Sequence, residues 1–153
     1  MIFLGNKWVF QSTLNSRAGW TIYQNNEFRA RIKYFFSEDG RIEGYYFAKL
    51  SGRMTMEMDH KGNHPLFELI EDIVEPEFPL VIDMHRIREI DTAGIGSLIM
   101  LLRQRRNVPA GVFRGKTIIT GIPECARQLF EVYKIPQSSI EIYSTLDEAL
   151  IML

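Results

Sequence analysis

The chain has 153 residues, which fits one domain, with 46% hydrophobic residues and a formal net charge of −1. This neutral balance gives no electrostatic footprint for nucleic acid or an anionic membrane surface, so neither partner is expected. With Cys125 as its single cysteine, the chain cannot form an internal disulfide, and a reducing compartment is expected. Met1–Lys7 does not have the pattern of a secretory signal, and no apolar run approaches the roughly 18 residues of a membrane helix. We therefore expect a soluble cytoplasmic protein without membrane insertion.

The first third of the chain has the pattern of strands. A strand is expected at Gly19–Tyr23, followed by a turn at Gln24–Asn26, whereas the first dozen residues show no clear pattern. Polar and apolar residues alternate along Glu27–Phe36, which is typical of a half-buried strand. Ser37–Gly40 predicts a turn and Arg41–Leu50 a returning strand, so these segments are expected to form a β-hairpin.

Near Gly52 the pattern changes to helices that alternate with strands. The expected elements are a helix from Pro65 to Ile73, a buried strand Leu80–Met84, a helix Ala93–Arg106, a strand Lys116–Gly121, a helix Pro123–Lys134 and a strand Ile140–Tyr143. Thr145 with Glu148 three residues later is a capping box that predicts a last helix. Alternation of this kind implies crossovers. We therefore predict an α/β sandwich, in which helices pack on a mixed, mainly parallel sheet with an N-terminal β-hairpin extension.

Two local patterns have a structural explanation that we favour over a chemical one. Gly94-Ile95-Gly96 follows a strand and opens a helix, but without a third glycine the dinucleotide fingerprint is incomplete, and close backbone packing is expected instead. Cys125 lies near a helix start, where a thiol pKa can fall, but we expect a buried small hydrophobic side chain. The three arginines of the last turn of the helix 93–106, which suit the helix dipole, are Arg103, Arg105 and Arg106.

The histidines do not form a convincing catalytic or metal site. His60 and His64, with Glu57 and Asp59 nearby, have the right chemistry for a metal, but they lie in a loop and do not share a helix face. Solvated loop side chains are favoured there. His85 follows the expected strand end, where a structural or surface role is favoured. We therefore predict no catalytic residue, no metal and no cofactor.

Thr92 stands where the buried strand gives way to a helix, between Asp91 and Ala93. Either Asp91 or Thr92 can cap this helix, which contributes about 0.5–2 kcal/mol. The same place can carry a phosphate, because a helix N-terminus has unpaired N–H groups and a positive dipole end. Both uses of the Thr92 hydroxyl remain open at this point.

Residues 81–84 and 90–98 resemble the central motif of the STAS domain, the sulfate transporter and anti-sigma factor antagonist family. That motif is an apolar strand ending in Asp, a few residues, and then Ile-Asp-Ser-Ser-Gly followed by an apolar helix. Lys49–Arg53 resembles the early strand with its glycine turn, and Tyr143–Leu150 resembles the usual STAS ending. The resemblance covers roughly residues 42–153 and leaves residues 1–41 as a β-rich extension.

The resemblance implies a regulatory protein rather than an enzyme. In the bacterial anti-sigma antagonist branch, a serine/threonine kinase of the GHKL type, which is also the anti-sigma factor, phosphorylates the hydroxyl after the Asp. A PP2C-type phosphatase reverses this step. Carried over, the acceptor is Thr92, with Ala93 in place of the usual second serine. The partner-binding residues that the resemblance implies are Asp91, Ala93, Gly94, Ile95, His85 and Arg86, with an expected loop at Met84–Glu89.

Two other functions are compatible with the sequence. The chain could be a non-switching STAS subunit of a transporter, lipid-transport or signalling scaffold complex, in which Thr92 is only a cap. It could also be a small enzyme that uses His85 or the His60–His64 loop. The sequence allows a homodimer, and the N-terminal extension could cover a sheet edge or form a partner surface.

Overall fold

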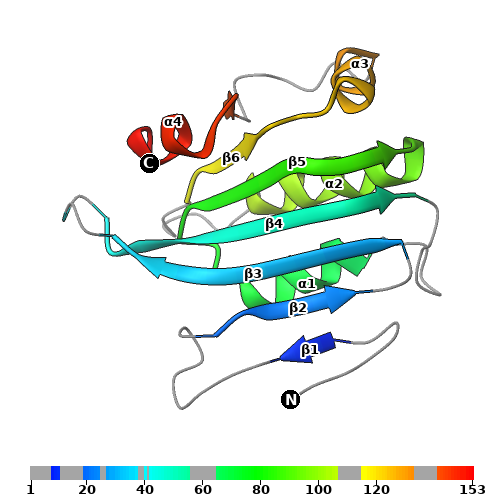
Figure 1. Cartoon of the computed structure of the whole chain (residues 1–153). Helices are drawn as coiled ribbons and strands as arrows, with labels where there is room; N and C mark the ends of the chain where they lie inside the picture. Colours follow the sequence, from blue (N-terminus) through cyan, green and yellow to red (C-terminus); the bar gives the residue numbers. More distant parts are fainter. Residues whose placement is uncertain are drawn as a thin grey trace.

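The computed structural model describes residues 8–10, 19–24, 27–37, 40, 42–55, 65–106, 115–132 and 141–153. Within these ranges the strands form one seven-stranded sheet, in which their order equals their order along the chain (Figure 1). The strands are β1 (Trp8–Phe10), β2 (Thr21–Gln24), β3 (Phe28–Phe36), β4 (Gly44–Met54), β5 (Leu80–Ile90), β6 (Thr117–Thr120) and β7 (Glu141–Tyr143). The helices are α1 (Pro65–Ile73), α2 (Thr92–Arg106), α3 (Glu124–Val132) and α4 (Leu146–Ile151).

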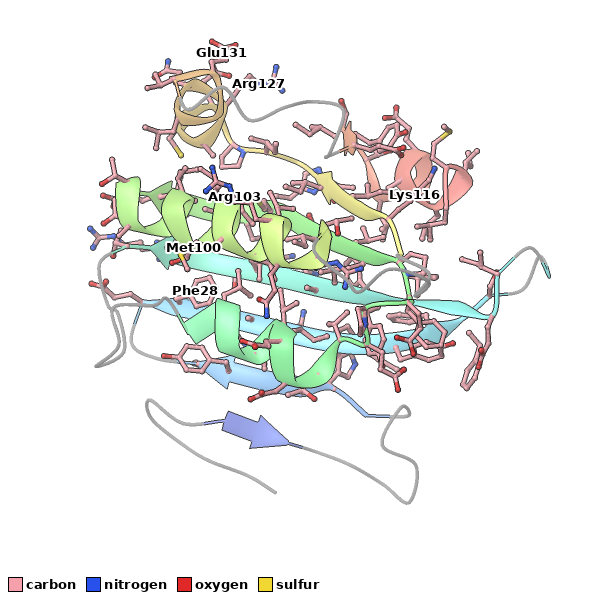
Figure 2. The ribbon with its side chains drawn as sticks, turned by 180° about the vertical axis from the view of Figure 1, so that it is seen from behind. Phe28, Met100, Arg103, Lys116, Arg127 and Glu131 are labelled. Atoms are coloured by element: carbon pink, nitrogen blue, oxygen red, sulfur yellow. The ribbon has the colours of Figure 1, made fainter. Side chains whose placement is uncertain are left out.

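The sheet is antiparallel from β1 to β4 and parallel from β4 to β7. Each parallel pair is joined by a crossover that contains α1, α2 or α3. Right-handed crossovers between strands whose order never reverses place all of their helices on the same face. Figure 1 shows α1 and α2 behind the sheet, and Figure 2 shows them in front of it from the opposite side. The predicted α/β class with a mixed sheet is confirmed.

The main core lies between the sheet and the helices α1, α2 and α3. Helix α2 contributes Ile95 and Leu98, and α1 contributes Leu69, all with an exposed fraction of 0%. Burial of each such side chain contributes about 1.5–3 kcal/mol. Ile95 and Leu98 belong to the apolar stripe predicted for this helix, so the helical period was interpreted correctly. Among the described helices, none is long and apolar enough to cross a membrane.

We call the opposite side of the sheet the open face. Among the described helices only α4 packs on it, where Ala149 joins a small cluster with Phe47, Val81 and Ile118. The rest of this face is formed by half-buried or exposed side chains of β2 to β5. It is the face of the sheet turned toward the viewer in Figure 1, away from α1 and α2. The open face therefore carries partly buried aromatic side chains next to the α4 cluster, namely Trp20, Phe35 and Tyr45, as well as polar and charged side chains.

The described N-terminal strands agree with the sequence. The side chains of β3 alternate between buried and less buried along Phe28–Phe36, and the strand pairs with β4 over nine positions. Gly40 has a φ of 74°, which suits the predicted turn. The division predicted between residues 41 and 42 falls between β3 and β4, two neighbours in one sheet, and stays a prediction. Asn25, Asn26, Glu38 and Asp39 of the predicted turns lie outside the described residues.

The end of β4 differs from the prediction. We expected the strand to end at Leu50 in a glycine turn, but β4 continues through Gly52 to Met54. Gly52 has a φ of 94°, and a Cβ there would meet the backbone oxygen of Glu27. Glycine here permits a close approach between β3 and β4 at an irregular point of the sheet rather than a turn.

The expected loop at Met84–Glu89 is wrong, because β5 continues through it as far as Ile90. The pairing of β5 with β4 is irregular at two places, and at each place β5 uses one residue more than β4. Each extra residue is a β-bulge, which turns two neighbouring side chains toward the same face. Met84, Ile87 and Ile90 are therefore buried at a spacing of three, with exposed pairs between them. This spacing lacks the alternation that identifies a strand in a sequence.

The C-terminal elements agree with the prediction in their type and order. The capping box is confirmed, because the N–H of Glu148 donates to Thr145 Oγ1 at 3.2 Å. The prediction that Cys125 is buried is wrong, because its side chain is exposed. Helix α3 turns Ala126 into the core, and its neighbour Cys125 lies about 100° around the helix from it. The side chain of Phe130, and all of Tyr133, lie outside the described part of the chain.

The prediction for Arg105 also needs correction. We expected it only to complement the helix dipole, but its side chain is buried. Its guanidinium donates to Thr117 Oγ1 and to the carbonyl oxygen of Phe78, each at 2.7 Å. Burial lowers the pKa of Arg105 to about 10, so the side chain remains charged at neutral pH. Arg105 therefore joins the end of α2 to the start of β6 and to the segment before β5.

We predict that Arg105→Ala lowers the free energy of unfolding by about 1–3 kcal/mol, because it leaves buried acceptors without a donor. Arg103→Ala is the matched control, since Arg103 is exposed on the same helix (Figure 2) and removal of its charge should change stability by less than about 0.5 kcal/mol. Urea unfolding measures both variants. Equal losses in the two variants would contradict a structural role for the Arg105 contacts.

Candidate functional site

Helix α2 begins at Thr92, and the residue before it supplies the cap. Asp91 Oδ1 accepts a hydrogen bond from the N–H of Gly94 at 2.8 Å, and the Asp91 carbonyl accepts one from the N–H of Ile95 at 3.0 Å. These are the two bonds by which an N-cap residue starts a helix. The N–H of Asp91 donates to the carbonyl of Met54 at 3.3 Å, which ties the helix start to the end of β4. Asp91, and not Thr92, is the cap.

Thr92 is the first helical residue, and its side chain is exposed. Its hydroxyl makes no hydrogen bond with the part of the chain that the structure describes. Ala93, the next residue, is half-buried. Because Asp91 already satisfies the helix start, the Thr92 hydroxyl is not required for folding and is accessible from solvent.

Two predicted partner-binding residues are buried beneath this helix start. Gly94 is buried, and a Cβ there would meet the carbonyl oxygen of Met54. Ile95 has an exposed fraction of 0% and belongs to the main core. Gly94 allows α2 to approach β4, as the close-packing interpretation expected, whereas a Cβ at Gly96 would meet no atom of the described chain within 4 Å. Gly94 and Ile95 thus position the helix start and do not form its surface.

His85 and Arg86 lie elsewhere, as exposed residues of β5 on the open face. Helix α2 starts beyond the end of that strand and packs on the other face. The structure therefore brings Asp91, Thr92 and Ala93 together and separates them from His85 and Arg86.

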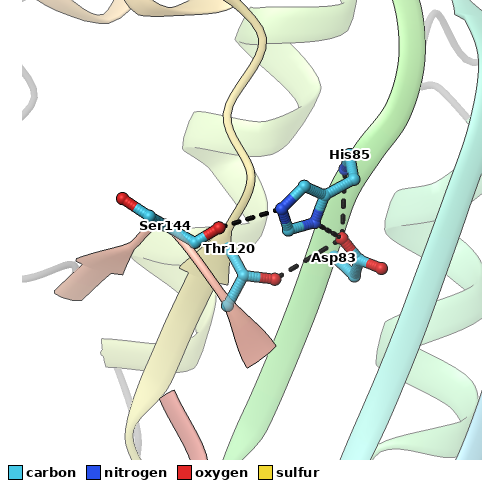
Figure 3. A network of polar contacts seen from close by, with 4 residues as sticks. All are labelled: Asp83, His85, Thr120 and Ser144. Carbon is cyan, nitrogen blue, oxygen red and sulfur yellow. Dashed lines mark hydrogen bonds and ion pairs between the residues drawn. The ribbon is translucent and has the colours of Figure 1, made fainter. Parts of the chain in front are cut away.

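His85 belongs to a polar network of its own, shown in Figure 3. Asp83 Oδ1 accepts a hydrogen bond from the His85 backbone N–H at 3.0 Å and lies 2.5 Å from its ring Nδ1. The other ring nitrogen, Nε2, lies 2.9 Å from the carbonyl oxygen of Ser144. Thr120 donates to the same Asp83 oxygen at 3.5 Å. The network joins β5 to the end of β6 and to the segment between β7 and α4.

The network favours the protonated form of His85. A carboxylate and a carbonyl oxygen only accept hydrogen bonds, so both ring nitrogens must carry a proton to bond with both. The hydrogen bond to Asp83 raises the pKa of His85 above its ordinary value of 6.5, although partial burial opposes this. No sequence pattern identified Asp83, Thr120 or Ser144 as part of this network. Only the spacing of Asp83 and His85, two residues apart on one strand, could have indicated the first of them.

The predicted histidine loop cannot be compared with the structure. His60, His64, Glu57 and Asp59 lie outside the described residues. Within the described ranges, no group of three or more His, Cys, Asp and Glu side chains is placed to hold a metal ion. Helix α2 therefore carries the candidate site at its first residues, with Thr92 as its exposed polar group.

We predict that Asp91→Ala and Thr92→Ala differ in their effect on stability. Loss of the cap in Asp91→Ala should lower the free energy of unfolding by about 0.5–2 kcal/mol, whereas Thr92→Ala should change it by less than about 0.5 kcal/mol. Urea unfolding followed by circular dichroism compares the two. The opposite order would assign the cap to Thr92.

We also predict that His85 titrates above 6.5. A raised pKa in the folded state means that protonated His85 stabilises the fold, fully below pH 6.5, and that this contribution is lost as the pH rises through the folded-state pKa. An NMR titration of the His85 ring measures the pKa, and Asp83→Asn should lower it. An unchanged pKa in Asp83→Asn would show that Asp83 is not the cause.

Comparison with solved structures places this arrangement in a known fold. An anti-sigma factor antagonist from Mycobacterium paratuberculosis is similar, with 18% identity, a TM-score of 0.52, and coverage of 79% of this chain and 92% of that one. A putative anti-sigma factor antagonist from Thermotoga maritima has 14% identity, a TM-score of 0.51 and the same coverage. An uncharacterized protein of the DUF3478 family with a SpoIIAA-like fold from Shewanella loihica PV-4 has 21% identity, a TM-score of 0.51, and coverage of 85% and 98%. At these low identities, the structural similarity shows a shared fold.

The family follows from the sequence itself. No curated protein matches the chain. The family model of the STAS domain matches residues 52–149, which is more than half of the chain and includes both β5 and the helix start at Thr92. The resemblance found in residues 81–84 and 90–98 is thus confirmed, and the chain belongs to the STAS domain family.

Proposed function

We propose that this chain is a bacterial regulatory protein of the anti-sigma factor antagonist type, without catalytic activity, that is switched by reversible phosphorylation of Thr92. A serine/threonine kinase of the GHKL type, acting as the anti-sigma factor, is its partner, and a PP2C-type phosphatase resets it in the cytoplasm. One observation carries the proposal: Thr92 presents an exposed hydroxyl at the first position of α2, while Asp91 performs the capping.

The local geometry suits an added phosphate. The cap satisfies the N–H groups of Gly94 and Ile95, which leaves those of Thr92 and Ala93 at the positive end of the helix dipole. A phosphate on Thr92 adds about −1.5 to −2 charges beside these groups. Because the hydroxyl is exposed, this charge changes the surface without entering the core.

The partner surface in this proposal centres on Asp91, Thr92 and Ala93. Gly94 and Ile95 contribute by holding the helix in position, since both are buried. His85 and Arg86 would contact only a partner that also reaches the open face. Ala93 leaves Thr92 as the one hydroxyl at the first two helical positions, so the acceptor is not shared.

A second candidate is a non-switching STAS subunit of a transporter, lipid-transport or signalling scaffold complex. One observation favours it: the cap is already a carboxylate, so a phosphate on the next residue places like charges side by side. In that case the same surface binds its partner without chemical modification. A search for phosphothreonine at Thr92 in protein from its own cells distinguishes the two candidates.

We predict that Thr92→Glu abolishes binding to the kinase partner, while Thr92→Ala retains it, because only the first mimics the phosphate charge. Gln128→Glu is the matched control, since it adds one negative charge at an exposed position of α3 and should leave binding unchanged. Calorimetry with the purified GHKL-type kinase measures the dissociation constants. Equal affinity of Thr92→Glu and Thr92→Ala would exclude the switch.

A further inference from the structure

The register of the sheet places four polar residues in one row across the open face. Gln24 of β2 is opposite Arg29 of β3, Arg29 is opposite Ser51 of β4, and Ser51 is opposite Arg86 of β5. Neighbouring strands are about 4.8 Å apart, so the two arginines begin about 10 Å apart with a small serine between them. A row with long side chains on both sides of a short one forms a hollow.

A cavity of about 390 Å³ lies at this row and is open to solvent. Its lining consists of Gln24, Glu27, Phe28, Arg29, Ser51, Gly52, Arg86 and Arg88. Three of these residues are arginines and one is a glutamate, so the lining carries a formal charge of +2 on a chain with a net charge of −1. The volume is within the range of cavities that bind small molecules, about 300–1,000 Å³.

The positive charge of this cavity is not neutralised by the surrounding acids. Arg53 holds both nearby glutamates, with Glu89 Oε2 at 2.7 Å and Glu27 Oε1 at 3.5 Å from its guanidinium. Within the described residues, Arg29, Arg86 and Arg88 make no ion pair and no side-chain hydrogen bond. The Nε of Arg29 is buried and has no hydrogen-bond partner. A buried donor without a partner costs free energy.

The two bulges of β5 produce this concentration of arginines. If the alternation that buries Met84 continued along a strand without a bulge, Arg86 and Arg88 would face the core and Ile87 would face the open side. Here the register shifts turn two consecutive residues at a time toward the open face, while Ile87 remains 4% exposed in the core. The bulges thus present cationic side chains beside Ser51 without loss of core packing.

We propose that this cavity binds the phosphate monoester group of a small molecule. A guanidinium donates two parallel hydrogen bonds to phosphate oxygens, and a dianion matches the charge of +2 on the lining. Ser51 and Gln24 add a hydroxyl and an amide between and beside the arginines. The volume of about 390 Å³ suits a small molecule, and the chemistry of the cavity is independent of Thr92 and of the proposed switch.

The test uses the full chain and glycerol 3-phosphate as the probe, titrated into isotope-labelled protein and followed by NMR at constant ionic strength. We expect saturable shifts confined to the row formed by Gln24, Arg29, Ser51 and Arg86, and weaker or no shifts with acetate. Inorganic phosphate in a parallel titration distinguishes recognition of the phosphate alone from recognition of the ester. Shifts that spread over the whole surface, or identical titrations with acetate and glycerol 3-phosphate, would overturn the proposal.

Charge-removing variants test the residues themselves. Arg86→Gln and Arg29→Gln should each weaken the affinity about tenfold, because each removes one charge-assisted pair of hydrogen bonds. Arg127→Gln is the control, since it removes the same charge from an exposed position of α3 (Figure 2) and should leave the affinity unchanged. Arg86 is exposed, so its variant should fold even if the Arg29 variant does not. Unchanged affinity in Arg86→Gln would contradict this site.

Discussion

The unbroken order of the parallel strands is the constraint on which the rest of this structure depends. From β4 to β7 each new strand is added on the same side of the previous one, so the usual right-handed crossovers place α1, α2 and α3 on one face. The apolar side chains of the strands then have their main core on that face. The other side is free to carry charged residues, except where α4 covers its β6–β7 end. Because the helices pack mainly on one face, the side chains that stabilise the fold lie on that face, and the side chains available to a ligand or partner lie on the other.

Strand β5 connects these two sides. Its bulges keep Met84, Ile87 and Ile90 in the core, while the residues between them point to the open face. Directly after β5 ends, the backbone N–H of Asp91 donates a hydrogen bond to the carbonyl oxygen of Met54. That hydrogen bond and the close approach of Gly94 to the same carbonyl fix where α2 starts. Arg86 and Arg88 of the proposed phosphate cavity and Thr92 of the proposed switch therefore lie on consecutive segments of the chain but on different faces of the sheet, and a substitution can affect one without the other.

Sequence patterns predicted those features that depend on residues close in the chain. The alternation in Glu27–Phe36, the helical period at Ile95 and Leu98, and the Thr145 capping box are all local, and the structure contains them. The features that depend on register were not predictable. In the sequence, the three-residue spacing of the buried side chains Met84, Ile87 and Ile90 is typical of a loop or a helix. Only the pairing with β4 shows that this segment is a strand. The row of Arg29, Ser51 and Arg86 exists only when three strands, separated in the chain by more than twenty residues each, are aligned.

At the candidate site, the sequence identified the place but could not assign the cap. Asp91 and Thr92 are both good capping residues, and only the hydrogen bond from Gly94 to the Asp91 carboxylate distinguishes them. This assignment has a physical consequence for the proposed switch. A hydroxyl that capped the helix would lose its hydrogen bond when modified, and phosphorylation would then disturb the fold. A hydroxyl at the first helical position can gain a phosphate near free N–H groups, whose attraction offsets part of the repulsion from Asp91. The free energy of the modification can therefore appear mainly in partner binding rather than in the stability of the chain.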